Sequence, residues 1–270
     1  MSIVSVAMAE IVREGTWALR ALGYPYGTAE RAVSLLAWTE AVQGHALTML
    51  RVGAEAIVAG AAQPTPRWSV DPQGRNRAEV QGKCLFECGP PALDLATADA
   101  RLGGLGRAVL RGAIGNRLAA SLGALAAERG LAAVLVHAPD GDEITPVPPA
   151  GWICALPTPQ DPAFLAGSLG DPLPAAVPAA LRVAAQDIAE AIASGSGGFF
   201  SIAATPSDPL PPPPAATDWP QRLALAYQFG VETDSQDYET LYTLEERTWA
   251  PTSERSRAQA GYGHYQEGPR

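Results

Sequence analysis

The stretch from Pro90 to His137 decides the fold, and it reads PPALDLATADA, GGLGRAVLRG, NRLAASLGALAAERG and finally LAAVLVH. Alanine-rich segments with apolar residues at helical spacing alternate with short runs of valine and leucine, which predicts helix, strand, helix, strand. The run Val134–Val136 is continuously apolar, as expected of a strand buried on both faces. A strand, a crossover helix and a parallel strand make one α/β layer, whose loops commonly meet a small ligand.

Helices are expected on both sides of this unit. Apolar residues recur at helical spacing over residues 5–20, 28–42 and 45–58 before it, and over residues 178–194, 218–229 and 234–249 after it. Strand-like segments are expected at residues 78–87, 151–156 and 199–204. A proline run, PLPPPP at 209–214, is expected to be a stiff spacer before the C-terminal region.

The fold class that follows is α/β. An N-terminal helical bundle is predicted to pack on a small mixed sheet with crossover helices, and a helical region is predicted to follow. The expected divisions are residues 1–60 for the N-terminal helices, 61–210 for the α/β core, and 211–270 for the spacer, the last helices and a mobile tail.

The composition limits the kinds of partner that the protein is expected to bind. The chain has 270 residues and a formal charge of −9, and its basic residues are scattered, so it lacks the clustered cations that nucleic acid requires. No apolar run approaches the roughly 20 residues of a membrane span, and no secretory leader is recognisable at the N-terminus. Three cysteines argue against a disulfide framework, so a cytoplasmic protein is expected. The charged fraction of 17% suggests helix faces covered by partners, either in a homo-oligomer or with other protein subunits.

A few polar residues lie where an α/β layer could bind a small acidic ligand. The turn RGAIGN, Arg111 to Asn116, follows a strand, so its amides together with Arg111 or Arg117 could hold an anion. His137 ends a buried strand, a common position for site residues. The alternative is a tight turn with solvated arginines and a histidine satisfied by the backbone.

Other catalytic patterns are weak. The glycines of GGLGRAVLRG precede a strand, whereas a dinucleotide fingerprint places them between strand and helix. Cys84 and Cys88 would share one face of the strand expected at 78–87, and Cys154 or a histidine could complete a zinc site with them. Buried thiols are the preferred interpretation, and no metal site is predicted.

Two resemblances carry further expectations. The three N-terminal helices, GHALTMLR, and the stretch from Pro90 to His137 together resemble the malate/L-lactate dehydrogenase family of non-Rossmann NAD(P)-dependent oxidoreductases. This resemblance implies that His45 matches a family histidine and would be the catalytic proton donor if the protein is an enzyme. The chain departs from the family pattern at two places. Met49 stands near an expected arginine, and Ile114 and Gly115 stand where a second, catalytic histidine is expected.

The opening helices together with APTSERSRAQAGYG, residues 250–263, are similar to a bacterial family of unassigned function. The two resemblances are compatible if that family is a degenerate relative of the dehydrogenases. The expected function is therefore a non-catalytic or accessory protein on a dehydrogenase-like scaffold, forming oligomers and binding a small ligand or other subunits without a cofactor. The alternative is an NAD(P)H-dependent reductase of a 2-keto or cyclic imino acid.

Overall fold

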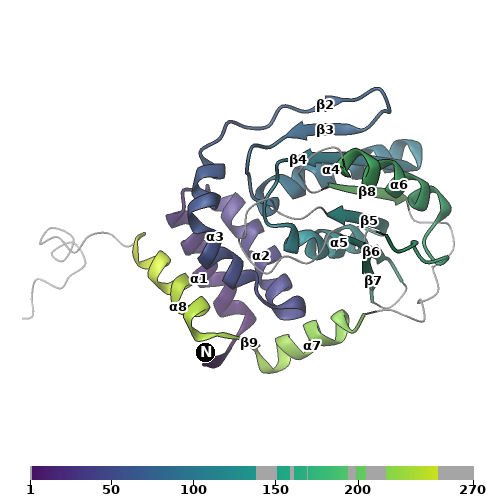
Figure 1. Cartoon of the computed structure of the whole chain (residues 1–270). Helices are drawn as coiled ribbons and strands as arrows, with labels where there is room; N and C mark the ends of the chain where they lie inside the picture. Colours follow the sequence, from purple (N-terminus) through teal and green to yellow (C-terminus); the bar gives the residue numbers. More distant parts are fainter. Residues whose placement is uncertain are drawn as a thin grey trace, which may run out of the picture.

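The computed structural model describes residues 2–137, 151–158, 161–168, 170–193, 199–204 and 217–248. The protein is α/β, as predicted: a group of helices packs beside a mixed sheet that has helices on both of its faces (Figure 1). No helix in these ranges is long and apolar enough to cross a membrane.

Most of the predicted helices and strands begin and end close to the predicted positions, but the strands at residues 3–6, 69–70, 163–168 and 231–234 were not predicted. The helices are α1 (Met8–Ala21), α2 (Tyr26–Gln43), α3 (Ala46–Ala61), α4 (Leu85–Gly103), α5 (Ala119–Glu128), α6 (Ala179–Ala193), α7 (Trp219–Phe229) and α8 (Ser235–Glu246), with a short 3-10 turn, η1, at Asn116–Leu118. The strands are β1 (Ile3–Val6), β2 (Ser69–Val70), β3 (Asn76–Glu79), β4 (Leu105–Arg111), β5 (Leu131–His137), β6 (Gly151–Leu156), β7 (Ala163–Ser168), β8 (Phe199–Ala204) and β9 (Val231–Asp234). Helix, strand, helix and strand therefore follow one another from α4 to β5, as the deciding stretch predicts.

The main sheet has the order β2-β3-β4-β8-β5-β6-β7. Strands β4 and β5 run parallel to each other, but β8 lies between them and pairs antiparallel with both. The crossover through α5 therefore passes over one intervening strand. This arrangement brings the end of β5, the start of β6 and the end of β7 together at one rim of the sheet, because β6 pairs antiparallel with both of its neighbours.

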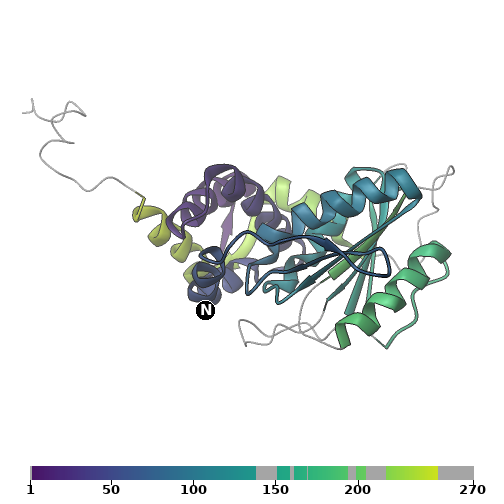
Figure 2. The same ribbon diagram turned by 90° about the horizontal axis from the view of Figure 1, so that it is seen from above.

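Two hydrophobic clusters lie on opposite faces of this sheet. Helices α4 and α5 cover one face, whose apolar residues merge with those of the N-terminal helices into one large cluster. Helix α6 covers the other face over a smaller cluster that includes Val134, Val136, Leu181 and Ile188. Figure 2 shows these helices on the two sides of the twisted sheet.

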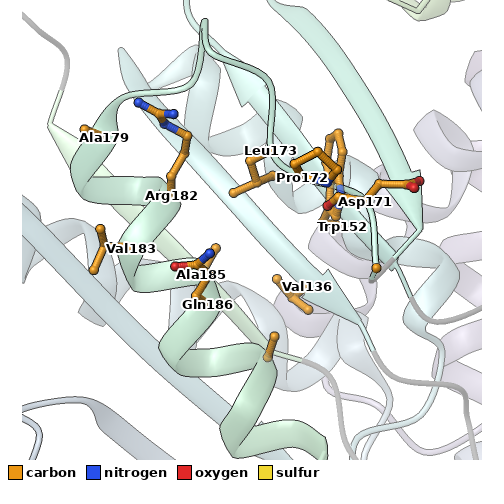
Figure 3. Close-up of a pocket in the computed structure, with 12 residues that line it drawn as sticks. Val136, Trp152, Asp171, Pro172, Leu173, Ala179, Arg182, Val183, Ala185 and Gln186 are labelled. Carbon is orange, nitrogen blue, oxygen red and sulfur yellow. The ribbon is translucent and has the colours of Figure 1, made fainter.

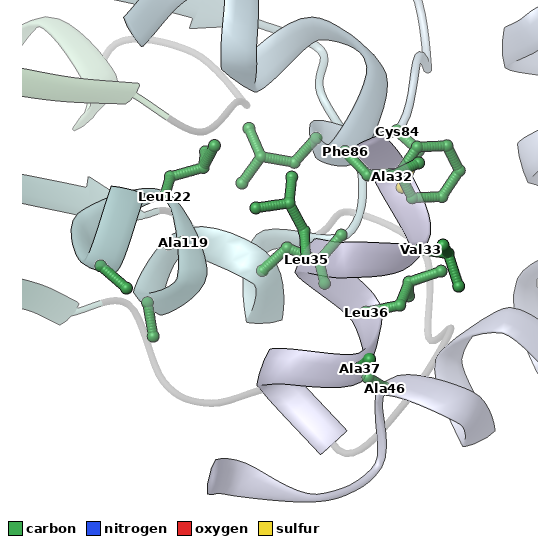
Figure 4. Packing of buried hydrophobic residues seen from close by; sticks show 14 of the residues in the cluster. Ala32, Val33, Leu35, Leu36, Ala37, Ala46, Cys84, Phe86, Ala119 and Leu122 are labelled. Atoms are coloured by element: carbon green, nitrogen blue, oxygen red, sulfur yellow. The ribbon is translucent and has the colours of Figure 1, made fainter. Parts of the chain in front are cut away.

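Helix α2 joins the helical group to the sheet region. Its Leu35 and Leu36 lie among Phe86 from α4 and Leu122 from α5 (Figure 4). Phe86, Leu36 and Leu122 are all fully buried. The helix is apolar around most of its circumference because it is enclosed on several sides.

The C-terminal helices pack against the N-terminal helices. Strand β9 pairs antiparallel with β1, α8 packs on α1, and α7 packs on α2. The first and last of the three expected regions are therefore in direct contact. The tail segment 250–263 that carries the second resemblance, like the proline run 209–214, lies outside the described residues.

The strand predicted at 78–87 is wrong beyond Glu79. Gln81 and Gly82 both have positive φ values, 50° and 81°, so the chain turns there, and α4 begins at Leu85. Cys84 is the N-cap of this helix and Cys88 lies in its first turns. The segment AEVQGKCLFE contains the end of a short strand, a turn and the start of a buried helix. A short apolar pattern of this kind does not distinguish a strand from a helix.

Candidate functional site

Three of the predicted ligand-binding residues, Asn116, Arg117 and His137, line one cavity of about 360 Å³ at the rim of the sheet. We call it the rim pocket. It lies where η1, the end of β5, the start of β6 and the end of β7 meet the end of α2. Its full lining is Gln43, Asn116, Arg117, His137, Trp152, Ile153, Ala166, Gly167, Ser168 and Asp171.

The turn between β4 and α5 carries Asn116 and Arg117 to this position. Gly112 and Gly115 have φ values of 72° and 79°, in the left-handed region that favours glycine. Gly115 is also the N-cap of η1, so the chain reverses there and points the following residues to the rim. The sequence predicts this turn because the glycines are closely spaced between a strand and a helix.

His137 is the last residue of β5 and stands opposite Gly151 of β6. It is only 6% exposed, and its Nδ1 has no hydrogen-bond partner among the described residues. Burial lowers the pKa of His137 to about 4, because an imidazolium ion would lose its hydration there. The side chain is therefore a neutral imidazole at pH 7, able to exchange a hydrogen bond with a ligand.

Arg117 supplies the positive charge of the rim pocket. Its Nη1 donates to the carbonyl oxygen of Gly44 at 3.3 Å, which ties the guanidinium to the loop between α2 and α3. Burial lowers the pKa of Arg117, and the nearby negative charge of Glu40 acts in the opposite direction. Arginine keeps its proton at neutral pH even so, and its planar fork suits a carboxylate.

Gln43 contributes a second buried polar atom that lacks a partner. Its Oε1 is inaccessible to solvent and accepts no hydrogen bond from the described residues. Buried polar atoms are almost always hydrogen-bonded, by protein, water or ligand, since leaving one unsatisfied costs about 1 to 3 kcal/mol. His137 and Gln43, which carry these two atoms, therefore line the same cavity as the partly buried cation of Arg117.

The remaining predicted residues are not part of this lining. His45 is the exposed N-cap residue of α3, with a φ of 63°, and it makes no capping hydrogen bond. Arg111 ends β4, where its carbonyl oxygen accepts from the amide of Val80 at 2.8 Å. The structure therefore groups Asn116, Arg117 and His137 and leaves His45 and Arg111 outside.

The two positions where the chain departs from the dehydrogenase pattern lie side by side. A Cβ on Gly115 would stand 3.4 Å from Met49 Sδ and 2.8 Å from Cys84 Sγ. Met49 is 2% exposed and Cys84 is fully buried. This spot is packed with sulfur and carbon, so it offers neither the proton donor nor the cation that reduction of a 2-keto acid needs.

The three cysteines do not meet. Cys84 and Cys88 belong to the cluster under α4, whereas Cys154 on β6 belongs to the cluster under α6, on the other face of the sheet. The zinc hypothesis for this trio is therefore wrong, because Cys154 lies on the opposite face of the sheet from Cys84 and Cys88. Within the part of the chain that the structure describes, no three metal-ligating side chains come together.

A second, larger cavity adjoins the rim pocket. We call it the α6 cavity; its volume is about 630 Å³, and it lies between α6 and the sheet, with Val136, Leu173, Val183 and Arg182 among its lining residues (Figure 3). Trp152 and Asp171 line both cavities. Together the two have the volume typical of sites for larger organic ligands, roughly 300 to 1,000 Å³.

Reasoning from the sequence missed Gln43, Trp152 and Asp171. Gln43 ends a helix two residues before His45, and that proximity was the only signal available. Trp152 and Asp171 come from segments far along the chain, and only the pairing of β5 with β6 and of β6 with β7 brings them to the rim.

Comparisons with known proteins establish the class of fold. No family model matches the chain, and no curated protein sequence matches it either. Solved structures do match. A dehydrogenase from Sinorhizobium meliloti superposes with a TM-score of 0.67 at 16% identity, over 90% of this chain and 100% of that chain. The fold is thus of the kind found in dehydrogenases.

Two further solved structures agree. Malate dehydrogenase from Pyrococcus horikoshii OT3 has a TM-score of 0.64 at 13% identity, covering 91% of this chain and 95% of that chain. Delta1-piperideine-2-carboxylate reductase from Pseudomonas syringae pvar. tomato has a TM-score of 0.63 at 13% identity, covering 89% and 99% respectively. Identities this low show the shared fold and leave the activity to be argued from the site.

Proposed function

We propose that the protein binds a small organic acid in the rim pocket and acts as a non-catalytic or accessory protein on a dehydrogenase-type scaffold. The observation that carries this proposal is that Arg117, His137 and Gln43 line one cavity of about 360 Å³, and that His137 Nδ1 and Gln43 Oε1 have no hydrogen-bond partner among the described residues. The guanidinium would bind the carboxylate, and the two neutral groups would hydrogen-bond a neighbouring oxygen or nitrogen.

The packing around Gly115 supports the non-catalytic part of this proposal. Reduction of a ketone at this position needs a proton donor next to the carbonyl, and Met49, Cys84 and Gly115 supply none. His137 is close to the pocket but neutral at pH 7, because its pKa lies near 4. The proposal includes the interpretation that the bacterial family of unassigned function is a degenerate relative of the dehydrogenases.

An NAD(P)H-dependent reductase of a 2-keto or cyclic imino acid is the second candidate, favoured by the fold shared with a piperideine-carboxylate reductase. A cyclic imine is protonated readily in water and depends less on an enzymic proton donor than a ketone does. Trp152 and Asp171 line both cavities, so their side chains would lie beside a dinucleotide that extended from one cavity into the other.

Isothermal titration calorimetry tests the proposal with short 2-oxo acids and a cyclic imino acid, with and without NADPH. Wild-type protein should bind at least one of these acids, and Arg117→Gln should weaken binding at least about tenfold, because a hydrogen bond to a charged group is worth about 1.5 to 3 kcal/mol. The matched control is Arg111→Gln, which removes an arginine six residues away that does not line the pocket. It should change the Kd by less than about twofold, which is a smaller change than the loss of one hydrogen bond to a charged group would cause.

Following NADPH absorbance with the same acids separates the two candidates. No oxidation is expected from the binding protein. Steady oxidation of NADPH that Arg117→Gln abolishes would replace this proposal with the reductase. Absence of any acid binding in a folded wild-type protein would remove both.

A further inference from the structure

Trp152 forms part of the lining of both the rim pocket and the α6 cavity. It is the second residue of β6, it is 7% exposed, and it pairs with Val136 on β5 and Gly167 on β7. Figure 3 shows its side chain at the end of the α6 cavity, beside Pro172 and Asp171.

Two contacts hold the indole in place. Its Nε1 donates to the carbonyl oxygen of Asp171 at 3.2 Å. On the neighbouring strand, a Cβ added to Gly167 would stand 2.4 Å from Trp152 Cζ2 and 2.7 Å from Cε2, so the ring lies directly on the glycine backbone. Only glycine leaves room for the indole at this position.

The two cavities that Trp152 lines differ in chemistry. The rim pocket has Arg117, His137 and Gln43, whereas most of the α6 cavity lining is aliphatic, including Val136, Leu173 and Val183. Asp171 also lines both cavities, and its carboxylate accepts from the amide of Ser168 at 2.9 Å. That negative charge disfavours a ligand carboxylate near the wall, so an acid in the rim pocket should place its carboxylate at Arg117 and its other end toward Trp152.

We propose that Trp152 is a specificity-determining wall: it closes the rim pocket against the α6 cavity and restricts the site to short organic acids. This inference rests on the proposed function, since it names the size class of the acid bound at Arg117. Shortening Trp152 joins the polar and apolar cavities into one site, which then accepts acids with an aliphatic tail.

The test compares wild-type protein with Trp152→Ala, and uses pyruvate and 2-oxooctanoate as calorimetric probes. Wild-type protein should prefer pyruvate. In Trp152→Ala the preference should reverse, with about a fourfold gain in affinity for each methylene that enters the α6 cavity, the equivalent of about 0.8 kcal/mol per methylene. The matched control is Trp152→Phe, which loses the Nε1 hydrogen bond but keeps a ring as the wall, and it should retain the wild-type preference.

A crystal structure of the ligand-free Trp152→Ala protein tests the wall independently of acid binding. One continuous cavity is expected; two cavities still separated by protein overturn the inference, as does an unchanged chain-length preference in a folded variant. If wild-type protein binds neither acid, the proposed function fails while this structure still decides whether Trp152 is the wall. Trp152→Leu provides the same comparison with a smaller deletion if the alanine variant does not give a cooperative thermal transition.

Discussion

Acidification should destabilise the native protein through His137, and substitution of this residue should remove that effect. The folded-state pKa of His137 is about 4, whereas the ordinary value is 6.5. In the unfolded chain the imidazole gains a proton as the pH falls below 6.5, but in the native protein it stays neutral until about pH 4. The unfolded state therefore binds more protons in this window, and stability falls as the pH falls.

The size of the effect follows from the two pKa values. The expected loss of unfolding free energy is about 2 kcal/mol at pH 5, and it approaches about 3 kcal/mol at pH 4, since each unit of pKa difference corresponds to about 1.4 kcal/mol. Well above pH 6.5 the contribution vanishes because the imidazole is then neutral in both states. His137 is 6% exposed, so screening by solvent reduces this figure little.

Urea unfolding of wild-type protein and His137→Gln at pH 7 and pH 5 measures this contribution. The carboxylates titrate in both proteins, so their effect cancels in the difference between the two pH dependences. Wild-type protein should lose about 2 kcal/mol more than the variant over this interval. Equal losses in the two proteins would refute the assignment of a buried neutral imidazole at the rim.

Three further predictions concern packing. Gly115→His should destabilise the fold by about 2 to 5 kcal/mol in urea unfolding, because its φ is 79° and a Cβ there would stand 2.8 Å from Cys84 Sγ; a variant as stable as the wild-type protein would show that this spot is not closed. All three thiols should react with Ellman's reagent only after unfolding, since they are buried and burial raises the pKa of Cys154 to about 12; rapid reaction of any of them in native protein contradicts this. Asp237→Ala should lower the free energy of unfolding by about 2 to 3 kcal/mol in chemical denaturation, because it removes a buried carboxylate that pairs with Arg51 at 2.5 Å and accepts a hydrogen bond from Thr48. Asp218→Ala, at an exposed ion pair, should lower it by less than about 1 kcal/mol. Equal losses in the two variants would contradict a stabilising role for the buried pair.

The sequence predicted the layer from α4 to β5 because periodicity and glycine placement agree there. It also predicted that a turn near Asn116 and the end of a strand at His137 are positions for polar site residues, and the structure puts both on the rim pocket. These are local signals. Each depends on residues within one turn or one strand.

The parts that the sequence did not predict depend on contacts between distant segments. Strand β9 was missed because VETD is four residues long and is stabilised by pairing with β1 at the other end of the chain. Trp152 was read as an ordinary strand residue, since its role at the rim arises only when Gly167 lies beside it. The separation of Cys84 from Cys154 likewise depends on which face of the sheet each one occupies.

A crystal structure of the wild-type protein with oxamate, a stable mimic of a short 2-oxo acid, tests the central claim most directly. The account predicts the oxamate carboxylate at hydrogen-bond distance, about 2.7 to 3.2 Å, from the Arg117 guanidinium, with His137 Nδ1 or Gln43 Nε2 or Oε1 bonded to the other end and Trp152 unmoved. Oxamate bound elsewhere, or bound in the rim pocket without contact to Arg117, would contradict it.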